Sequence, residues 1–443
     1  MNKNMPTEKL YGIGTDGAAV MTGRLNGVVK QLTDSFPKVV GVACAAHRLA
    51  LACRDASNGV RYMAIFRDHL QDLYLYFQHS ANRTAALKTA ATTLGLADLK
   101  LKQVKDTRWL SQHQAIVVLQ RNLAAVLATL AEEVEVKRCP VAKGLYTFCA
   151  TYRFVASLYL QADVLPHLAR LSKIFQKANV NFLHIKEQVP ITIETLRRIK
   201  DAGTSPPLGS FLSCLHRDLD DPSGLGAQSI HHEEERNRRG QSLDDVPREQ
   251  QWSRFVADVA SPYISGLIHH LECRFENLNL LGAFSVLGPQ ATSQSDEQNN
   301  AHLKILANKF LPENEINVIQ EYQSLREHIH RGQFKDKSQA DILRLLASEC
   351  DEWGLIYPLL SRLAAIALVV PVSSVNCERD FSTMNRVKTD LRNRLQGEHL
   401  AACLRISING PEPEDLNYQR ALELFFSKPR KMKCSSAGCH ICK

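Results

Sequence analysis

Two acidic residues, Asp16 and Glu378, are the strongest candidates for chemistry in this chain. Asp16 follows the short apolar run Leu10-Tyr-Gly-Ile-Gly-Thr and precedes the pattern of an amphipathic helix. A carboxylate at the end of a strand, beside a helix N-terminus, is well placed to hold a metal ion. The alternative is a carboxylate that only caps the helix beginning near Ala18.

Glu378 lies in a segment that predicts a helix, because Ser373 and Ser374 supply N-cap residues before it. Apolar residues then recur at helical spacing: Cys377, Phe381, Met384 and Leu391. We expect this apolar row to face the core, which leaves Glu378 at the rim of that face, where a metal ligand is accessible. The alternative is a solvated partner of Arg379 or Arg386.

Four motifs occur in a fixed order along the chain. They are Thr15-Asp16-Gly17-Ala18, Cys44-Ala-Ala-His47-Arg-Leu49, Thr107-Arg108-Trp109 and Ser373-Ser374-x-x-x-Glu378-Arg379-x-Phe381-Ser382. Together they resemble the hAT transposase superfamily and its domesticated, zinc-finger-protein-like relatives. The resemblance implies a fold of the α/β plus all-α class, with a partial RNase H-like core interrupted by a long helical insertion domain.

The resemblance divides the chain into four expected parts. Residues 1–45 are the N-terminal part of the RNase H-like core without its first strands, and 46–365 are the helical insertion. Residues 366–426 are the C-terminal part of the core with the hAT dimerisation region, and 427–443 are a basic, cysteine-containing tail. Within the insertion, residues 218–251 carry few apolar side chains and predict a flexible loop.

Hydrophobic periodicity gives a matching order of elements. It predicts a strand at 10–15, a helix at 18–35 and a strand at 39–43, followed by a series of helices. The apolar stretch 353–375 is interrupted by prolines and an arginine, so we interpret it as a buried helix and not as a membrane span. We expect it to end in a short strand at 367–370.

Asp16 and Glu378 match the second and third catalytic carboxylates of the family. The family's first lies on the first strand of the core, and the fifteen residues before Asp16 are too few for the missing strands. Two-metal phosphoryl transfer needs enough acidic ligands for two divalent ions. We therefore expect an inactive remnant with no resident cofactor, in which Mg²⁺ or Mn²⁺ is held weakly at most.

The resemblance also suggests roles for residues around these carboxylates. The resemblance places Cys44 and His47 beside the active site. Their C-x-x-H spacing by itself does not supply the four ligands of a structural zinc site. Arg108 and Trp109 combine a cation with an aromatic ring, which suits contact with a phosphate and stacking on a base. Trp109 as a core anchor of the insertion is the alternative, and Arg379 is a further DNA-binding candidate.

Two other patterns point to weaker expectations. Gly12-x-Gly14-x-x-Gly17 has the letters of a dinucleotide fingerprint, but Asp16 places a negative charge in the phosphate cradle, so we expect no nucleotide cofactor. The tail from Lys428 to Lys433 is basic and precedes several cysteines, a composition typical of a disordered end with a weak nuclear-import patch.

The net charge of +8 favours an acidic partner, with nucleic acid first. The 12 cysteines lack the dense spacing of a small secreted framework, which favours a reduced compartment, the nucleus or else the cytoplasm. The resemblance implies self-association through an apolar surface of the closing helices: Leu391, Leu395, Leu400, Leu404 and Ile408.

Three hypotheses follow for the function. The first is a transposase-derived, non-catalytic nuclear protein that dimerises and binds DNA. The second is a fragment of an active hAT transposase, which cuts and joins DNA with metal ions. The third is a helical protein-interaction scaffold without DNA binding.

Overall fold

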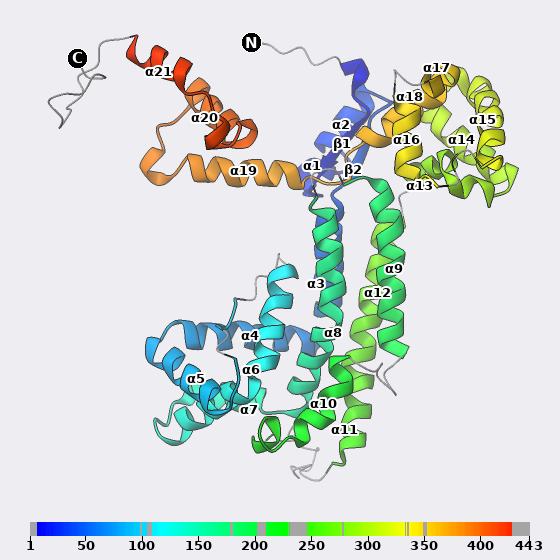
Figure 1. Cartoon of the computed structure of the whole chain (residues 1–443). Helices are drawn as coiled ribbons and strands as arrows, with labels where there is room; N and C mark the ends of the chain where they lie inside the picture. Colours follow the sequence, from blue (N-terminus) through cyan, green and yellow to red (C-terminus); the bar gives the residue numbers. More distant parts are fainter. Residues whose placement is uncertain are drawn as a thin grey trace. The chain divides into compact units, whose positions relative to one another are not determined.

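The computed structural model describes residues 7–97, 100–103, 109–177, 180–201, 210–228, 230, 246–276, 279–332, 334, 336–348 and 352–427. The chain divides into two compact units, Met1–Val375 and Asn376–Lys443 (Figure 1). Among the described residues, 77% are helical and 2% lie in strands. The largely all-α part of the predicted fold class is therefore confirmed.

A parallel pair of short strands lies near the N-terminus. β1 (Gly12–Thr15) pairs with β2 (Val40–Ala43), with Gly12 opposite Val40 and Thr15 opposite Ala43. Both strands lie inside the predicted ranges. Because the strands are parallel, their carboxyl ends meet at one edge, where the chain continues into Asp16 and Cys44.

The single helix predicted between these strands is divided into two. α1 (Ala19–Thr22) and α2 (Val28–Ser35) are separated by a turn that begins at Gly23 and ends at Gly27. Glycine is a poor helix former, and two glycines four positions apart are enough to interrupt a short helix.

Helices of the first unit follow the strand pair: α3 (Ala45–Gly59), α4 (Arg61–Gln78), α5 (Ala81–Thr93), α6 (Trp109–Glu135), α7 (Pro140–Cys149), α8 (Tyr152–Phe175), α9 (Phe182–Asp201) and α10 (Phe211–Asp220). α8 is the central helix, with buried residues around its whole circumference, and it packs against α6, α9 and α10. A helix that is apolar on all sides needs neighbours on all sides. Of the loop predicted at 218–251, residues 229 and 231–245 lie outside the described residues; α10 extends into its start, to Asp220, and α11 begins at Arg248 near its end.

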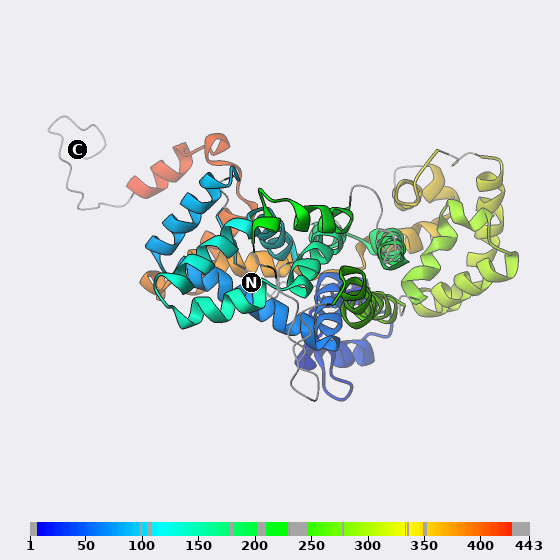
Figure 2. The ribbon, with the colours of Figure 1, turned by 90° about the horizontal axis from the view of Figure 1, so that it is seen from below.

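A long helical segment then returns along the unit. α11 (Arg248–Phe255) continues through a π-helical turn (Val256–Ala260) into α12 (Ser261–Phe275), which packs along α3. Two views show α9 and α12 side by side (Figures 1 and 2). Arg274 of α12 forms an ion pair with Asp55 of α3, so that α3 and the strand end before it are held against α12.

Shorter helices complete the first unit: α13 (Asn279–Ala283), α14 (Asp296–Phe310), α15 (Glu315–His330), α16 (Gln339–Ala347), α17 (Glu352–Ile356) and α18 (Pro358–Val369). The expectation of a strand at 367–370 is wrong, because α18 continues to Val369. The helix buries Leu360, Leu363 and Ala367 at helical spacing, and it ends two residues before Pro371, which cannot continue it.

Three helices belong mainly to the second unit: α19 (Val375–Val387), α20 (Gly397–Asn409) and α21 (Gln419–Phe426). Between residues 376 and 427, no side chain that the structure describes is buried. The expectation that the apolar row from Cys377 to Leu391 faces the core is therefore wrong: Cys377 is exposed, and Phe381 and Leu391 are 62% and 98% exposed. Helical spacing defines an apolar face but does not define what covers it.

One described helix is long and apolar enough to cross a membrane, at Gln112–Glu135 of α6. Its most apolar window is 61% buried within the structure, and α6 packs against α5, α7 and α8. This burial is the pattern of a core helix. The apolar stretch noted in the sequence at 353–375 is divided between α17, α18 and the start of α19.

Candidate functional site

Asp16 occupies an exposed turn immediately after β1. Its Oδ1 atom accepts a hydrogen bond from the backbone N–H of Ala18 at 3.0 Å. The residue between them, Gly17, has a φ of 80°, which glycine adopts without strain. The carboxylate thus closes the turn before α1 through the N-cap residue Ala18, and it lies within reach of solvent.

Cys44 and His47 lie at the adjacent strand end. Cys44 is fully buried between β2 and α3, and its backbone N–H donates to the carbonyl oxygen of Thr15 at 2.7 Å. His47 is exposed in the first turn of α3. Its Cδ2 atom lies 3.8 Å from the position that a Cβ atom on Gly17 would take, so the imidazole faces the turn that carries Asp16.

The segment after α18 closes over this strand edge. The backbone N–H of Ser374 donates to Cys44 Sγ at 3.3 Å, and the N–H of Ala45 donates to the carbonyl oxygen of Val372 at 2.9 Å. The hydroxyl of Ser373 donates to the carbonyl oxygen of Phe175, at the end of α8, at 3.1 Å. Residues 330 positions apart are thereby brought to one corner of the first unit.

The glycines of β1 have a packing role in this corner. An added Cβ atom on Gly12 would lie 2.9 Å from Cδ of Pro371, and one on Gly14 would lie 3.3 Å from its Cβ. The close approach of Pro371 therefore accounts for the two glycines, without any nucleotide. Pro371 and the Phe175 carbonyl were not among the predicted site residues, because no local spacing signals a contact of this range.

Glu378 and Arg379 lie in the second unit, on the exposed first turns of α19. The carbonyl oxygen of Glu378 accepts a hydrogen bond from the hydroxyl of Ser382 at 2.9 Å, which is an ordinary contact within a helix. Both residues make further interactions. The structure thus brings Asp16, Cys44 and His47 to one corner and places Glu378 on a separate unit.

The two remaining DNA-binding candidates are less well described. Trp109 is the first residue of α6, but its side chain lies outside the described part of the chain. Arg108 and the basic tail from Lys428 onward lie outside the described residues altogether. Their proposed roles stay predictions.

A metal centre needs several ligands within a few ångströms. In the part of the chain that the structure describes, no three His, Cys, Asp or Glu side chains gather closely enough to hold an ion. Mg²⁺ takes octahedral oxygen ligation, and two-metal phosphoryl transfer uses several carboxylates. Asp16 and its described neighbours therefore do not fit a resident two-metal centre.

The predicted dimerisation residues lie on the second unit and are accessible. Leu391 is 98% exposed and Ile408 is 39% exposed, while the other three leucines of the set are partly exposed. Leu400, Leu404 and Ile408 follow one another at intervals of four along α20 and form one row on its surface. Side chains of this type and spacing form contact surfaces between helices.

A comparison with protein families agrees with the predicted ancestry. The family model of the hAT C-terminal dimerisation region matches residues 320–408, which extend from within α15 into α20. The matched segment includes Glu378 and all five predicted dimerisation residues. Residues 320–408 therefore carry the dimerisation region of the hAT family, and this match supports a relationship of the chain to hAT transposases.

Proposed function

We propose that this chain is a non-catalytic, transposase-derived nuclear protein that self-associates through its second unit and binds DNA. The observation that carries the proposal is the exposed apolar surface within the matched dimerisation region. Leu391 is almost fully exposed, and Phe381 and Ile406 are 62% and 68% exposed. Large exposed apolar patches mark interaction sites in folded proteins, and these side chains are candidates for such a patch.

Self-association covers this surface at little structural cost. Burying a leucine side chain stabilises a complex by about 1.5–3 kcal/mol relative to leaving it exposed. In a two-fold symmetric dimer, each leucine of the set contributes twice, once from each copy. We propose the row Leu400, Leu404 and Ile408 as a contact face for the same row of a second copy.

Sedimentation equilibrium tests the proposal directly. We expect the wild-type chain to form a dimer or larger assembly at tens of micromolar, and Leu391→Asp to weaken that assembly at least tenfold by burying a charge in the interface. Leu25→Asp is the matched control, since Leu25 is 87% exposed and lies outside the matched region. A monomeric wild-type chain at these concentrations would overturn the proposal.

DNA binding is supported by the basic residues of the same unit. Arg386, Lys388, Arg392 and Arg394 are exposed and follow one another from the end of α19, and Arg379 lies on that helix. Lysine and arginine contacts with phosphates release counterions, so binding through them weakens steeply as salt rises. These residues suit a sequence-independent contact with the DNA backbone.

Fluorescence anisotropy with a labelled duplex separates this function from the scaffold alternative. We expect retention at low salt, a steep decline as salt rises, and a smaller slope after Arg392→Gln and Arg394→Gln together. Arg420→Gln is the control, because Arg420 is paired with Glu423 on α21. No binding at low salt would instead favour a helical interaction scaffold.

The non-catalytic part of the proposal rests on the number of carboxylates. Among the described residues, no three His, Cys, Asp or Glu side chains gather closely enough to hold an ion, whereas two-metal chemistry uses several carboxylates. We expect no nicking or strand transfer with Mg²⁺ or Mn²⁺. Metal-dependent cleavage that Asp16→Asn abolishes would show a fragment of an active transposase instead, and imaging of the tagged chain tests the nuclear location.

A further inference from the structure

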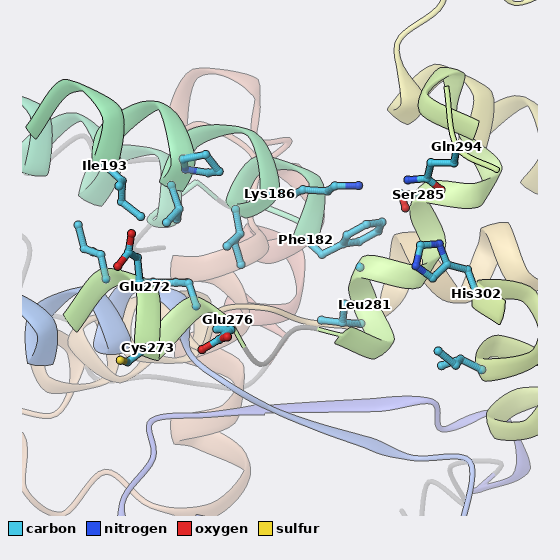
Figure 3. Close-up of a pocket in the computed structure, with 17 residues that line it drawn as sticks. Phe182, Lys186, Ile193, Glu272, Cys273, Glu276, Leu281, Ser285, Gln294 and His302 are labelled. Atoms are coloured by element: carbon cyan, nitrogen blue, oxygen red, sulfur yellow. The ribbon is translucent and has the colours of Figure 1, made fainter. Parts of the chain in front are cut away.

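A pocket of about 880 Å³ lies between α9, α12 and the segment from α13 to α14, in the first unit (Figure 3). It lies outside the matched dimerisation region and apart from the corner that carries Asp16. Pockets that bind small molecules have volumes of about 300–1,000 Å³ and mainly apolar walls. This pocket has both properties.

The apolar wall follows one side of α9. Phe182, Ile185, Val189 and Ile193 recur at helical spacing and line the pocket, facing Leu271 and Phe275 of α12. From Phe182 to Ile193 the helix rises about 16 Å, at 1.5 Å per residue. The wall is thus similar in length to the extended chain of dodecanoate.

Polar side chains gather at one end of this wall. Figure 3 shows Lys186 extending from α9 toward Gln294 and Ser285, with His302 nearby on α14. Among the described residues, Gln294 Oε1 and His302 Nδ1 are buried without a hydrogen-bond partner. A buried polar atom that lacks a partner is unfavourable, so a ligand that forms hydrogen bonds at this end is stabilised.

The charges of this end favour an anion. Burial lowers the pKa of Lys186, and burial followed by the charge of Lys186 lowers the pKa of His302. A bound carboxylate forms an ion pair with the Lys186 ammonium group and accepts a hydrogen bond from the N–H of the His302 imidazole. It also accepts from the NH2 group of Gln294 once that amide rotates to turn its NH2 toward the ligand. The opposite end carries Glu272, which is paired with Arg197 at 2.5 Å, and Glu276, so it does not attract a second anion.

We propose that this pocket binds one amphipathic monocarboxylate, a medium- or long-chain fatty acid. The carboxylate lies at the end formed by Lys186, Gln294 and His302, and the hydrocarbon chain lies along the apolar wall of α9. The site is independent of self-association and of DNA binding.

Isothermal titration calorimetry with dodecanoate, below its micellar concentration, tests the site on the full-length chain. We expect saturable binding of one dodecanoate per chain. Butanoate has the same head group with a short chain, and dodecyltrimethylammonium has the same chain with a positive head group. Both are expected to bind at least tenfold more weakly, and equal binding of either would overturn the proposal, as would no saturable binding of dodecanoate up to millimolar concentration.

Two variants locate the ligand. Lys186→Met keeps an apolar side chain of similar length and removes the charge, so it is expected to weaken the binding of dodecanoate at least tenfold. Lys309→Met is the control, because Lys309 is also partly buried with a lowered pKa but does not line the pocket. It is expected to leave the affinity for dodecanoate unchanged. Gly282 lines the pocket, and an added Cβ atom there meets no heavy atom within 4 Å. Gly282→Leu is therefore expected to fold and to block the space for the hydrocarbon chain of the ligand. Unchanged affinity in Lys186→Met, with folding verified by circular dichroism, would overturn the site.

Discussion

Single side chains connect parts of the first unit that are distant in sequence. Ser373 donates to the Phe175 carbonyl at 3.1 Å, and its Oγ atom accepts from the backbone N–H of Val375 at 3.3 Å. The same atom lies 3.7 Å from Cys44 Sγ. One hydroxyl therefore ties the end of α8, the start of α3 and the segment before α19 together.

We predict that Ser373→Ala lowers the free energy of unfolding by about 1–3 kcal/mol, because the Phe175 carbonyl is left without its donor. Urea denaturation measures the change. Ser382→Ala is the control, since its hydroxyl is exposed and bonds only within α19, and we expect a change within about 0.5 kcal/mol. Equal effects of the two substitutions would show that the Ser373 contact is not structural.

Glu133 of α6 shows how a buried charge is stabilised. Its carboxylate is paired with the Lys137 ammonium and accepts from the hydroxyl of Tyr76 at 3.1 Å, while the Arg83 guanidinium lies 3.8 Å away. Hydrogen bonding from Lys137 is the main cause that lowers the pKa of Glu133 below its ordinary value of 4.5. The ionised Glu133 carboxylate therefore stabilises the folded state above about pH 4.5, and this contribution is lost as pH falls through the lowered pKa.

Glu133→Gln tests the direction of this pH dependence. We predict a loss of about 1–3 kcal/mol in unfolding free energy at pH 7, since the hydrogen bonds to a charged acceptor are lost. The difference between variant and wild type should shrink as pH falls below 4.5, because the wild-type carboxylate is then protonated as well. Urea denaturation across this pH range measures it, and a pH-independent difference would contradict the assignment.

At the scale of elements, two carboxylates cap helices that begin far from them in sequence. Asp163 of α8 accepts from the backbone N–H groups of Phe211 and Leu212 at 2.8 and 2.9 Å, at the start of α10. Glu321 of α15 accepts from Leu359 and Leu360, at the start of α18. The first N–H groups of a helix lack partners within it, so these contacts fix where α10 and α18 begin.

Burial raises the pKa of Glu321 above its ordinary value of 4.5, against the opposing effect of the two N–H groups. A carboxyl whose folded pKa is raised binds its proton more tightly in the folded state, so its contribution to stability falls as pH rises from about 4.5 through the raised pKa. The stability contribution of Glu321 therefore changes with pH in the opposite direction to that of Glu133.

We predict that Glu321→Gln removes this contribution. As pH rises from 4.5 to neutrality, the unfolding free energy of the wild-type chain should fall relative to that of Glu321→Gln. Urea denaturation at several pH values measures this difference. Glu327→Gln, at an exposed position on the same helix, should run parallel to the wild type. Parallel curves for Glu321→Gln and the wild type would contradict the predicted linkage.

At the scale of the whole molecule, the two units differ in how they are stabilised. The first has a continuous core that includes most of α8, whereas residues 376–427 have no buried side chain among those described. Helices without a core are marginal on their own, because their stability normally comes from packing. The second unit therefore gains most from contact with another copy.

A concentration-dependent melting temperature is the expected consequence. Association that occurs only in the folded state stabilises by mass action, so the melting temperature of the wild-type chain should rise with protein concentration. Leu404→Asp, in the row along α20, should abolish that dependence, and Leu25→Asp should keep it. Differential scanning calorimetry over a wide concentration range measures both. The same dependence in both variants would place the interface elsewhere.

Much of the local structure was predictable from the residues alone. The two strands and the long helices were predicted from apolar spacing, and the order of motifs identified a family whose dimerisation region matches residues 320–408. The strand expected at 367–370 is wrong, although the β-branched valines of this segment favour a strand. The helix α18 continues to Val369 instead, because it buries Leu363 and Ala367 on one face. These signals depend on neighbours within a few positions, which is the range over which sequence patterns are informative.

Contacts between distant residues required the folded chain. The approach of Pro371 to Gly12 and Gly14, and the pocket that joins Lys186 to His302, depend on how helices pack, and no periodicity encodes that arrangement. The exposure of Phe381 and Leu391 has the same origin. An apolar face lowers the free energy only when something covers it, and whether that partner is this chain's own core or a second copy is a property of the assembled molecule.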